Sequence, residues 1–151
     1  MSAKTFSDGK RTVRILLTIL LIAVLAIAFW GKDSKQVSLE FREDDMILSA
    51  PEEDAFRVTI AYKDVSSMEL LTELVPGVCL SGTDSDIHKT GRWSNEAYGD
   101  YTLCISPGIP ACIVLDTADG IVVFNYESSD TTIQLFDALT EHIEKKTAEN
   151  G

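Results

Sequence analysis

The chain has 151 residues and a formal net charge of −11, because it carries 24 acidic and 13 basic residues. This length suits one domain with some residues left for an anchor, and the hydrophobic fraction of 45% is ordinary for a globular protein. An acidic surface repels phosphate groups, so neither nucleic acid nor anionic lipid headgroups are expected as partners of the domain.

An apolar run near the N-terminus predicts a membrane-spanning helix. Residues 13–30 read VRILLTILLIAVLAIAFW, with Arg14 as their only charge. A span needs about 20 apolar residues, so this run is at the short end, and the hydrocarbon selects a helix because every backbone group must pair internally. A buried core helix would need a polar face, which this run lacks. We therefore expect a basic tail at 1–12, a transmembrane helix at 13–30 and a linker at 31–36.

Basic residues on the two sides of the run predict its orientation. Lys4, Lys10 and Arg11 precede it and Arg14 lies at its start, and those after it are Lys32, Lys35 and Arg42. The positive-inside rule then places the N-terminus in the cytoplasm and the domain outside the cell membrane. A cleaved signal peptide is the alternative, because cleavage after Ala28 in Ala26-Ile27-Ala28 would release the domain. Phe29 and Trp30 extend the apolar run past that site, which favours the anchor.

Period-two alternation begins at Val37 and predicts a series of short strands. Apolar and polar side chains alternate, and charged turns such as Arg42-Glu43-Asp44-Asp45 separate the strands. The expected strands lie at residues 37–41, 46–50, 56–62 and 65–74. The last has a helical alternative, because Met68, Leu71 and Val75 also fit helical spacing.

Residues 75–99 have no clear period and predict a long irregular loop. Gly77, Gly82, Gly91 and Gly99 interrupt the segment. A loop of this length in a small domain is often functional, and a plain connector between strands is the alternative.

The C-terminal part returns to clear patterns. Strands are expected at residues 101–105, 111–115 and 121–126. Residues 106–110 and Asp119-Gly120 predict turns between them. The period then becomes helical, with a stripe of Leu135, Phe136, Leu139 and Ile143. Thr131 with Gln134, or Asp130, is expected to cap this helix.

The order of elements predicts a mainly β domain over residues 37–147, followed by a frayed tail at 148–151. About seven strands joined by antiparallel hairpins, with one terminal helix, imply a strongly bent antiparallel sheet or a partly open barrel. The amphipathic helix needs an apolar surface, and the sheet supplies one.

Several segments carry a resemblance to a known family. They are Gly91-Arg92-Trp93-Ser94-Asn95, Tyr98-Gly99-Asp100-Tyr101, Ile113-Val114-Leu115-Asp116-Thr117 and Val123-Phe124-Asn125. Together with the strand order they resemble the bacterial pleckstrin-homology (PH) domain families, which are often attached to membrane helices. The resemblance implies a PH-like fold and a non-catalytic interaction module. Phosphoinositide binding is not expected, because the basic loops of eukaryotic relatives have no counterpart in Arg42-Glu43-Asp44-Asp45.

The three cysteines, Cys79, Cys104 and Cys112, show no C-x-x-C spacing, so no zinc or redox motif is indicated. If the turn at 106–110 is a hairpin centred on Gly108, Cys104 and Cys112 lie opposite each other. Opposed Cβ atoms lie about 4.5–5.5 Å apart, slightly wide for the ~3.8 Å of a disulfide. A bridge in an oxidising compartment is one hypothesis, and two small buried apolar residues are the alternative.

Two further groups are candidates for a site. Trp93, Tyr98 and Tyr101 form an aromatic cluster that would bind a partner if exposed and would be core if buried. Residues 84–88 hold Asp84, Asp86 and His88, which suggests a metal-binding or hydrolytic loop as the alternative function.

No established catalytic motif accompanies these groups: the sequence has no G-x-S-x-G, P-loop or dinucleotide fingerprint, and Asp84-x-Asp86 lacks the rest of an EF-hand loop. No enzyme activity, cofactor or metal is therefore expected. The leading hypothesis is a single-pass, membrane-anchored interaction module that binds a protein or an envelope component.

Overall fold

The computed structural model describes residues 37–50 and 56–150. The predicted basic tail, transmembrane helix and linker lie outside the described residues, and so does Gly151. All described residues belong to one unit, Lys35–Gly151. Within the two described ranges, no helix combines the length and the apolar character needed to cross a membrane.

A first sheet of three antiparallel strands contains β1 (Ser38–Phe41), β2 (Asp45–Ser49) and β3 (Arg57–Ala61), in that order. Phe41 pairs with Met46, so the chain reverses tightly between β1 and β2. The Arg42 N–H donates to the Asp45 carbonyl at 2.9 Å within this turn. The period-two pattern thus predicted all three strands, with ends shifted by about one residue.

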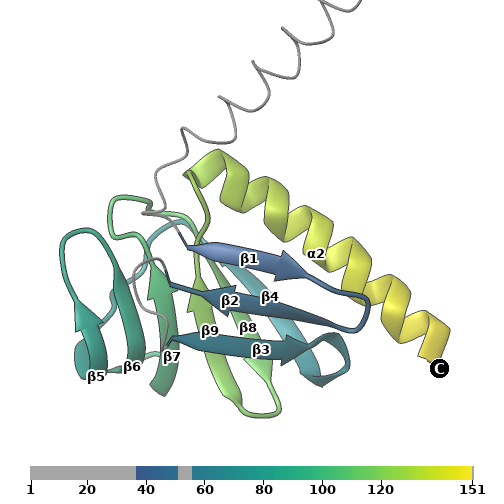
Figure 1. Ribbon diagram of the computed structural model, residues 1–151, viewed down its shortest axis with the longest axis horizontal. Helices are drawn as coiled ribbons and strands as arrows, with labels where there is room; N and C mark the ends of the chain where they lie inside the picture. Colours follow the sequence, from purple (N-terminus) through teal and green to yellow (C-terminus); the bar gives the residue numbers. More distant parts are fainter. Residues whose placement is uncertain (1–36, 51–55, 151) are drawn as a thin grey trace, which may run out of the picture. The chain divides into compact units, whose positions relative to one another are not determined.

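A second sheet of six strands has the order β4-β8-β9-β7-β6-β5. Its strands are β4 (Val65–Leu71), β5 (Val78–Asp84), β6 (Lys89–Asn95), β7 (Gly99–Ile105), β8 (Cys112–Thr117) and β9 (Gly120–Phe124). Neighbouring strands are antiparallel, except that β7 and β9 are parallel. Figure 1 shows the first sheet crossing in front of this second sheet.

The expected loop at 75–99 is wrong, because it contains β5 and β6. The sequences of β5 and β6 differ from those of ordinary strands, because each contains a glycine in its interior. These glycines, Gly82 and Gly91, face each other in the ladder. Both have positive φ, and a Cβ on Gly82 would lie 2.2 Å from the Thr90 carbonyl oxygen. The described residues therefore form nine strands rather than about seven. The helical alternative for β4 is also wrong, since β4 pairs with β8.

The expected hairpin between β7 and β8 is wrong as well, because β9 lies between these two strands. A turn does form, with the Ile109 N–H donating to the Ser106 carbonyl at 3.1 Å. Buried Asn125 holds it from the end of β9. The Asn125 Nδ2 donates to the Ser106 and Ile109 carbonyls, both at 3.0 Å, and its Oδ1 accepts from the Ser106 N–H at 2.9 Å. The turn therefore directs the chain past β9 rather than back along β7.

The C-terminal helix α2 (Ser129–Asn150) contacts β4, β8 and the 3-10 turn η1 (Tyr62–Asp64). Leu139 and Ile143 are its buried side chains on the predicted stripe. The cap is Ser128, whose Oγ accepts from the Thr131 N–H at 3.1 Å, so the predicted cap is wrong. Residues 148–150, where fraying is expected, are still helical.

The second sheet separates two apolar clusters. The helix-side core lies between both sheets and α2, and its largest members are Met46, Leu48, Tyr62, Ile113, Leu115, Phe124 and Leu139. The hairpin-side core lies on the other face and contains Trp93, Tyr101, Leu103, Ile105, Cys112, Val114 and Val123. Burial on both faces explains the nearly continuous apolar runs of β7, β8 and β9. The expected class, mainly β with one C-terminal helix, is confirmed.

Candidate functional site

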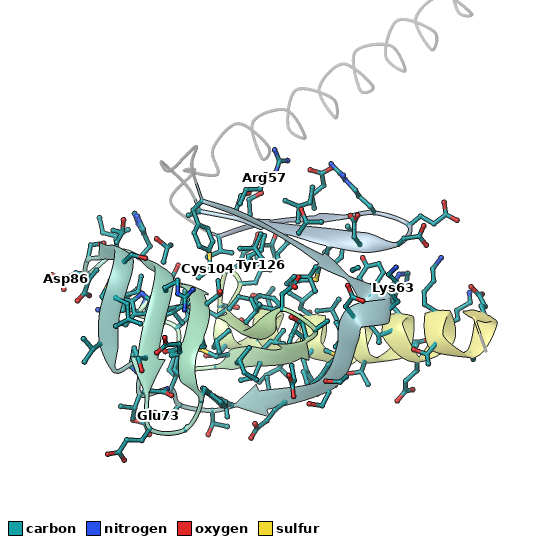
Figure 2. The ribbon with its side chains drawn as sticks, turned by 90° about the horizontal axis from the view of Figure 1, so that it is seen from below. Arg57, Lys63, Glu73, Asp86, Cys104 and Tyr126 are labelled. Carbon is teal, nitrogen blue, oxygen red and sulfur yellow. The ribbon has the colours of Figure 1, made fainter. Side chains whose placement is uncertain are left out.

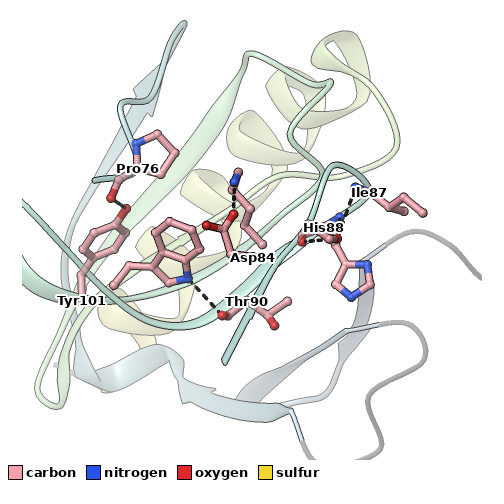
Figure 3. Close-up of polar contacts among 9 residues, drawn as sticks. Pro76, Asp84, Ile87, His88, Thr90 and Tyr101 are labelled. Atoms are coloured by element: carbon pink, nitrogen blue, oxygen red, sulfur yellow. Dashed lines mark hydrogen bonds and ion pairs between the residues drawn. The ribbon is translucent and has the colours of Figure 1, made fainter. Parts of the chain in front are cut away.

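Two of the three predicted partner-binding aromatics are buried in the hairpin-side core. Trp93 is 2% exposed and donates from Nε1 to the Thr90 carbonyl at 3.0 Å. Tyr101 is 4% exposed, and its hydroxyl donates to the Pro76 carbonyl at 2.7 Å (Figure 3). Neither ring is available to a partner, and Tyr101 holds two distant segments of the chain together.

Tyr98 is the aromatic residue that remains at the surface. Its half-buried ring meets Tyr101 edge to face, with centroids 5.7 Å apart. Burial raises the pKa of Tyr98, and burial together with Cys112 and Tyr98 raises the pKa of Tyr101 to about 12. Both hydroxyls therefore stay protonated and uncharged at neutral pH.

Tyr98 lines an open apolar groove of about 890 Å³. Its apolar lining comes from Leu71, Leu74, Val75, Val78, Leu80 and Tyr98. Glu73 and Glu96 also line it, whereas none of the lysines and arginines in the described part of the chain does. The groove thus combines aliphatic walls with negative charge.

The connection at 72–77 builds one wall of this groove. It joins β4 to β5, which lie at opposite edges of the second sheet. Asn95 holds it by donating from Nδ2 to the Val75 carbonyl at 3.0 Å. Gly77 lets it approach β6 closely, since a Cβ there would lie 2.0 Å from the Ser94 carbonyl oxygen. The wall is therefore tied to β6 and β7 by specific hydrogen bonds.

Exposed aliphatic side chains concentrate at this groove. Val75, Val78 and Leu80 are 75%, 66% and 51% exposed. Ile87, at the far end of the β5–β6 hairpin, is 55% exposed. These residues were not among the predicted site residues, because most of their segment was expected to be an irregular loop. The alternation of Val78 and Leu80 was the available signal.

The candidate metal-binding residues do not converge on a site. Asp84 forms an ion pair with Lys89, and Asp86 points outward from the tip of the β5–β6 hairpin (Figure 2). His88 is buried, and its backbone N–H donates to the Ser85 Oγ at 3.1 Å. Within residues 37–50 and 56–150, no three histidine, cysteine or acidic side chains are grouped so that they could hold a metal ion.

Cys104 and Cys112 are not opposite each other, because the expected hairpin does not form. They lie on strands separated by β9, with Cys104 in the helix-side core and Cys112 in the hairpin-side core. Neither of these two cysteines forms a disulfide. Burial raises the pKa of Cys112 to about 11, although a hydrogen bond from Asn125 opposes this. The reactive thiolate of Cys112 is therefore scarce at neutral pH.

The groove is the site that this geometry favours. Its exposed aliphatic side chains can bury apolar groups of another molecule, and its two glutamates can attract positive charge. None of the residues that carry these properties belongs to the predicted site except Tyr98. No protein-family model, curated protein or solved structure matches the chain.

Proposed function

We propose that the chain is a membrane-anchored, non-catalytic interaction module whose domain binds a protein or an envelope component. One observation carries this proposal: Val75, Val78 and Leu80 are exposed together around one open groove. Contiguous apolar surface of this kind commonly marks an interaction site in soluble domains.

The membrane anchor in this proposal is the apolar run at 13–30, in which Arg14 is the only charge. The tight cluster of Lys10, Arg11 and Arg14 before the run favours an N-terminus inside the cell and a domain outside. A cleaved signal ending at Ala28 is the competing arrangement.

The domain of this module has a PH-like fold in our proposal. Support comes from the three-stranded antiparallel sheet, the second sheet against it and the C-terminal helix over their shared core. The additional strands and the parallel pair of β7 and β9 depart from the seven antiparallel strands expected of that family. The proposal therefore depends on the general arrangement rather than on strand number.

The alternative, a metal-binding or hydrolytic domain, has less support. Its residues would be Asp84, Asp86 and His88, but Asp84 is paired with Lys89 and His88 is buried. Asp86 points outward from the hairpin tip, so the three side chains do not converge.

Two experiments on the full chain in a bacterium test the proposal. Protease treatment of intact cells should remove the domain and leave the anchor in the membrane. Protection until the cells are lysed would overturn the outward orientation. Domain free in the periplasm or medium would overturn the anchor in favour of a cleaved signal.

The interaction role is tested by photo-crosslinking in the same cells. A photoreactive phenylalanine derivative replaces Phe41, Val78 or Ile133, which are exposed on different elements. A discrete crosslinked product from at least one position is expected. Absence of a product from all three positions would contradict the interaction module.

A further inference from the structure

We infer that the groove binds a positively charged, extended segment of a partner protein. Aliphatic side chains of the segment would contact Val78 and Tyr98, with lysine or arginine next to Glu73 and Glu96. This inference rests on the proposed function and specifies its partner.

The apolar lining accounts for the aliphatic part of the ligand. The groove volume of about 890 Å³ falls within the range of roughly 300–1,000 Å³ that is usual for ligand sites. Half-buried Leu71, Leu74 and Tyr98 line it together with the exposed Val75 and Val78. The exposed side chains leave water only when another apolar group covers them, which is the driving force for binding.

The charges select among apolar ligands. Glu73 and Glu96 line the groove. The neighbouring acidic residue Asp100 forms an ion pair with Arg92, with the two side chains 3.4 Å apart. A fatty acid or an anionic lipid would place its negative headgroup beside the two glutamates. A second copy of the chain would bring the same acidic groups together. A basic segment instead gains attraction, so it is the ligand that the charges favour.

The strand next to the groove limits how the segment is held. The outer edge of β5 has no partner strand among the described residues. However, the register shifts between Cys79 and Ser81, and Gly82 has φ +121°. A bulge and a positive-φ glycine interrupt regular pairing and discourage addition of a long strand. The segment is therefore recognised mainly by its side chains, which gives it a sequence preference.

Binding of two peptide pools to the full chain in detergent micelles tests this preference. Each pool holds nine-residue peptides with the same randomised aliphatic positions, separated by lysine in one pool and by glutamate in the other. We expect the lysine pool to bind at least roughly tenfold more tightly at low salt, as measured by fluorescence anisotropy. Val78→Asn should weaken this binding, whereas Ile133→Asn, at an exposed position of α2, should not. The pair Glu73→Gln and Glu96→Gln should bring the two pools close to equal affinity.

Several results would overturn the inference. They are equal affinity of the two pools, binding of neither pool, and binding that Val78→Asn leaves intact. Val78-dependent binding of oleate would assign the groove to a lipid, and Val78-dependent dimerisation would assign it to a second copy. Crosslinks in cells from Phe41 or Ile133 but not Val78 would leave the proposed function standing and remove the groove from it.

Discussion

The two faces of the second sheet are covered in different ways. The helix-side core is enclosed by a second layer, since the first sheet and α2 both contribute buried side chains to it. The hairpin-side core has no such layer among the described residues and is bordered by the connection at 72–77 and by Tyr98. Complete cover leaves a sealed core, and partial cover leaves a groove with exposed aliphatic side chains. Stability and recognition are thus expected to reside on opposite faces of one sheet.

The largest expected effect is a cavity in the sealed core. Leu139 is 2% exposed and joins α2 to both sheets. Leu139→Ala should lower the free energy of unfolding by about 2–5 kcal/mol. Urea unfolding of the full chain in micelles, followed by circular dichroism, measures this. Ile133→Ala, at an exposed position on the same helix, should change it by no more than about 0.5 kcal/mol. Equal effects of the two substitutions would contradict the packing of α2.

A smaller effect is expected where the backbone of β5 and β6 meets. Gly91 has φ +98°, and a Cβ there would lie 2.2 Å from the Ser81 carbonyl oxygen. Gly91→Ala should therefore cost about 1–3 kcal/mol of backbone strain and separate the two strands. Gly108→Ala is the matched control, because its Cβ would meet nothing within 4 Å. Indistinguishable unfolding midpoints for the two variants would show that the two strands do not approach as described.

The smallest expected effect comes from the hydroxyl that ties the groove wall to β7. Tyr101→Phe removes the hydrogen bond to the Pro76 carbonyl and should cost about 1 kcal/mol at neutral pH. Tyr98→Phe serves as the control and should cost less.

The same variant has a signature at alkaline pH. The pKa of Tyr101 is raised from 10.0 to about 12 in the folded chain, so the folded state holds its proton more tightly than the unfolded state. The contribution of Tyr101 to the free energy of unfolding is fully present below pH 10 and is lost as the pH rises towards 12. The free energies of unfolding of the wild-type chain and of Tyr101→Phe should therefore converge across this pH window. A constant difference between them would indicate that Tyr101 is not buried.

Local sequence patterns predicted the elements that have an uninterrupted alternation of apolar residues or a continuous apolar run. The first sheet, β7 to β9 and the stripe of α2 follow from the spacing of apolar residues. These patterns failed for β5 and β6, because Gly82 and Gly91 take positions where an apolar alternation would otherwise be visible. Glycine at these positions allows the two backbones to approach closely. This requirement comes from the neighbouring strand, so it cannot be read from the sequence of one strand alone.

The position of β9 and the groove depend on long-range contacts. Proximity in sequence favours pairing β7 with β8, whereas the turn held by Asn125 makes room for a later strand between them. The aromatic cluster illustrates the same limit. Trp93 and Tyr101 are both buried, and Tyr101 is bonded to Pro76 of the connection at 72–77. Aliphatic residues of that segment and of β5 are exposed instead.

The central place of β9 constrains when the domain can fold during synthesis. In the order β4-β8-β9-β7-β6-β5, the strand ladder between the pair β4-β8 and the group β7-β6-β5 runs through β9. A nascent chain that has emerged only as far as Asp119 holds both parts without the strand that connects them. The ribosome must therefore release Gly120–Phe124 before the sheet can become continuous, and α2 follows within a few residues. The second sheet is consequently completed only after its last strand in sequence, β9, has left the ribosome.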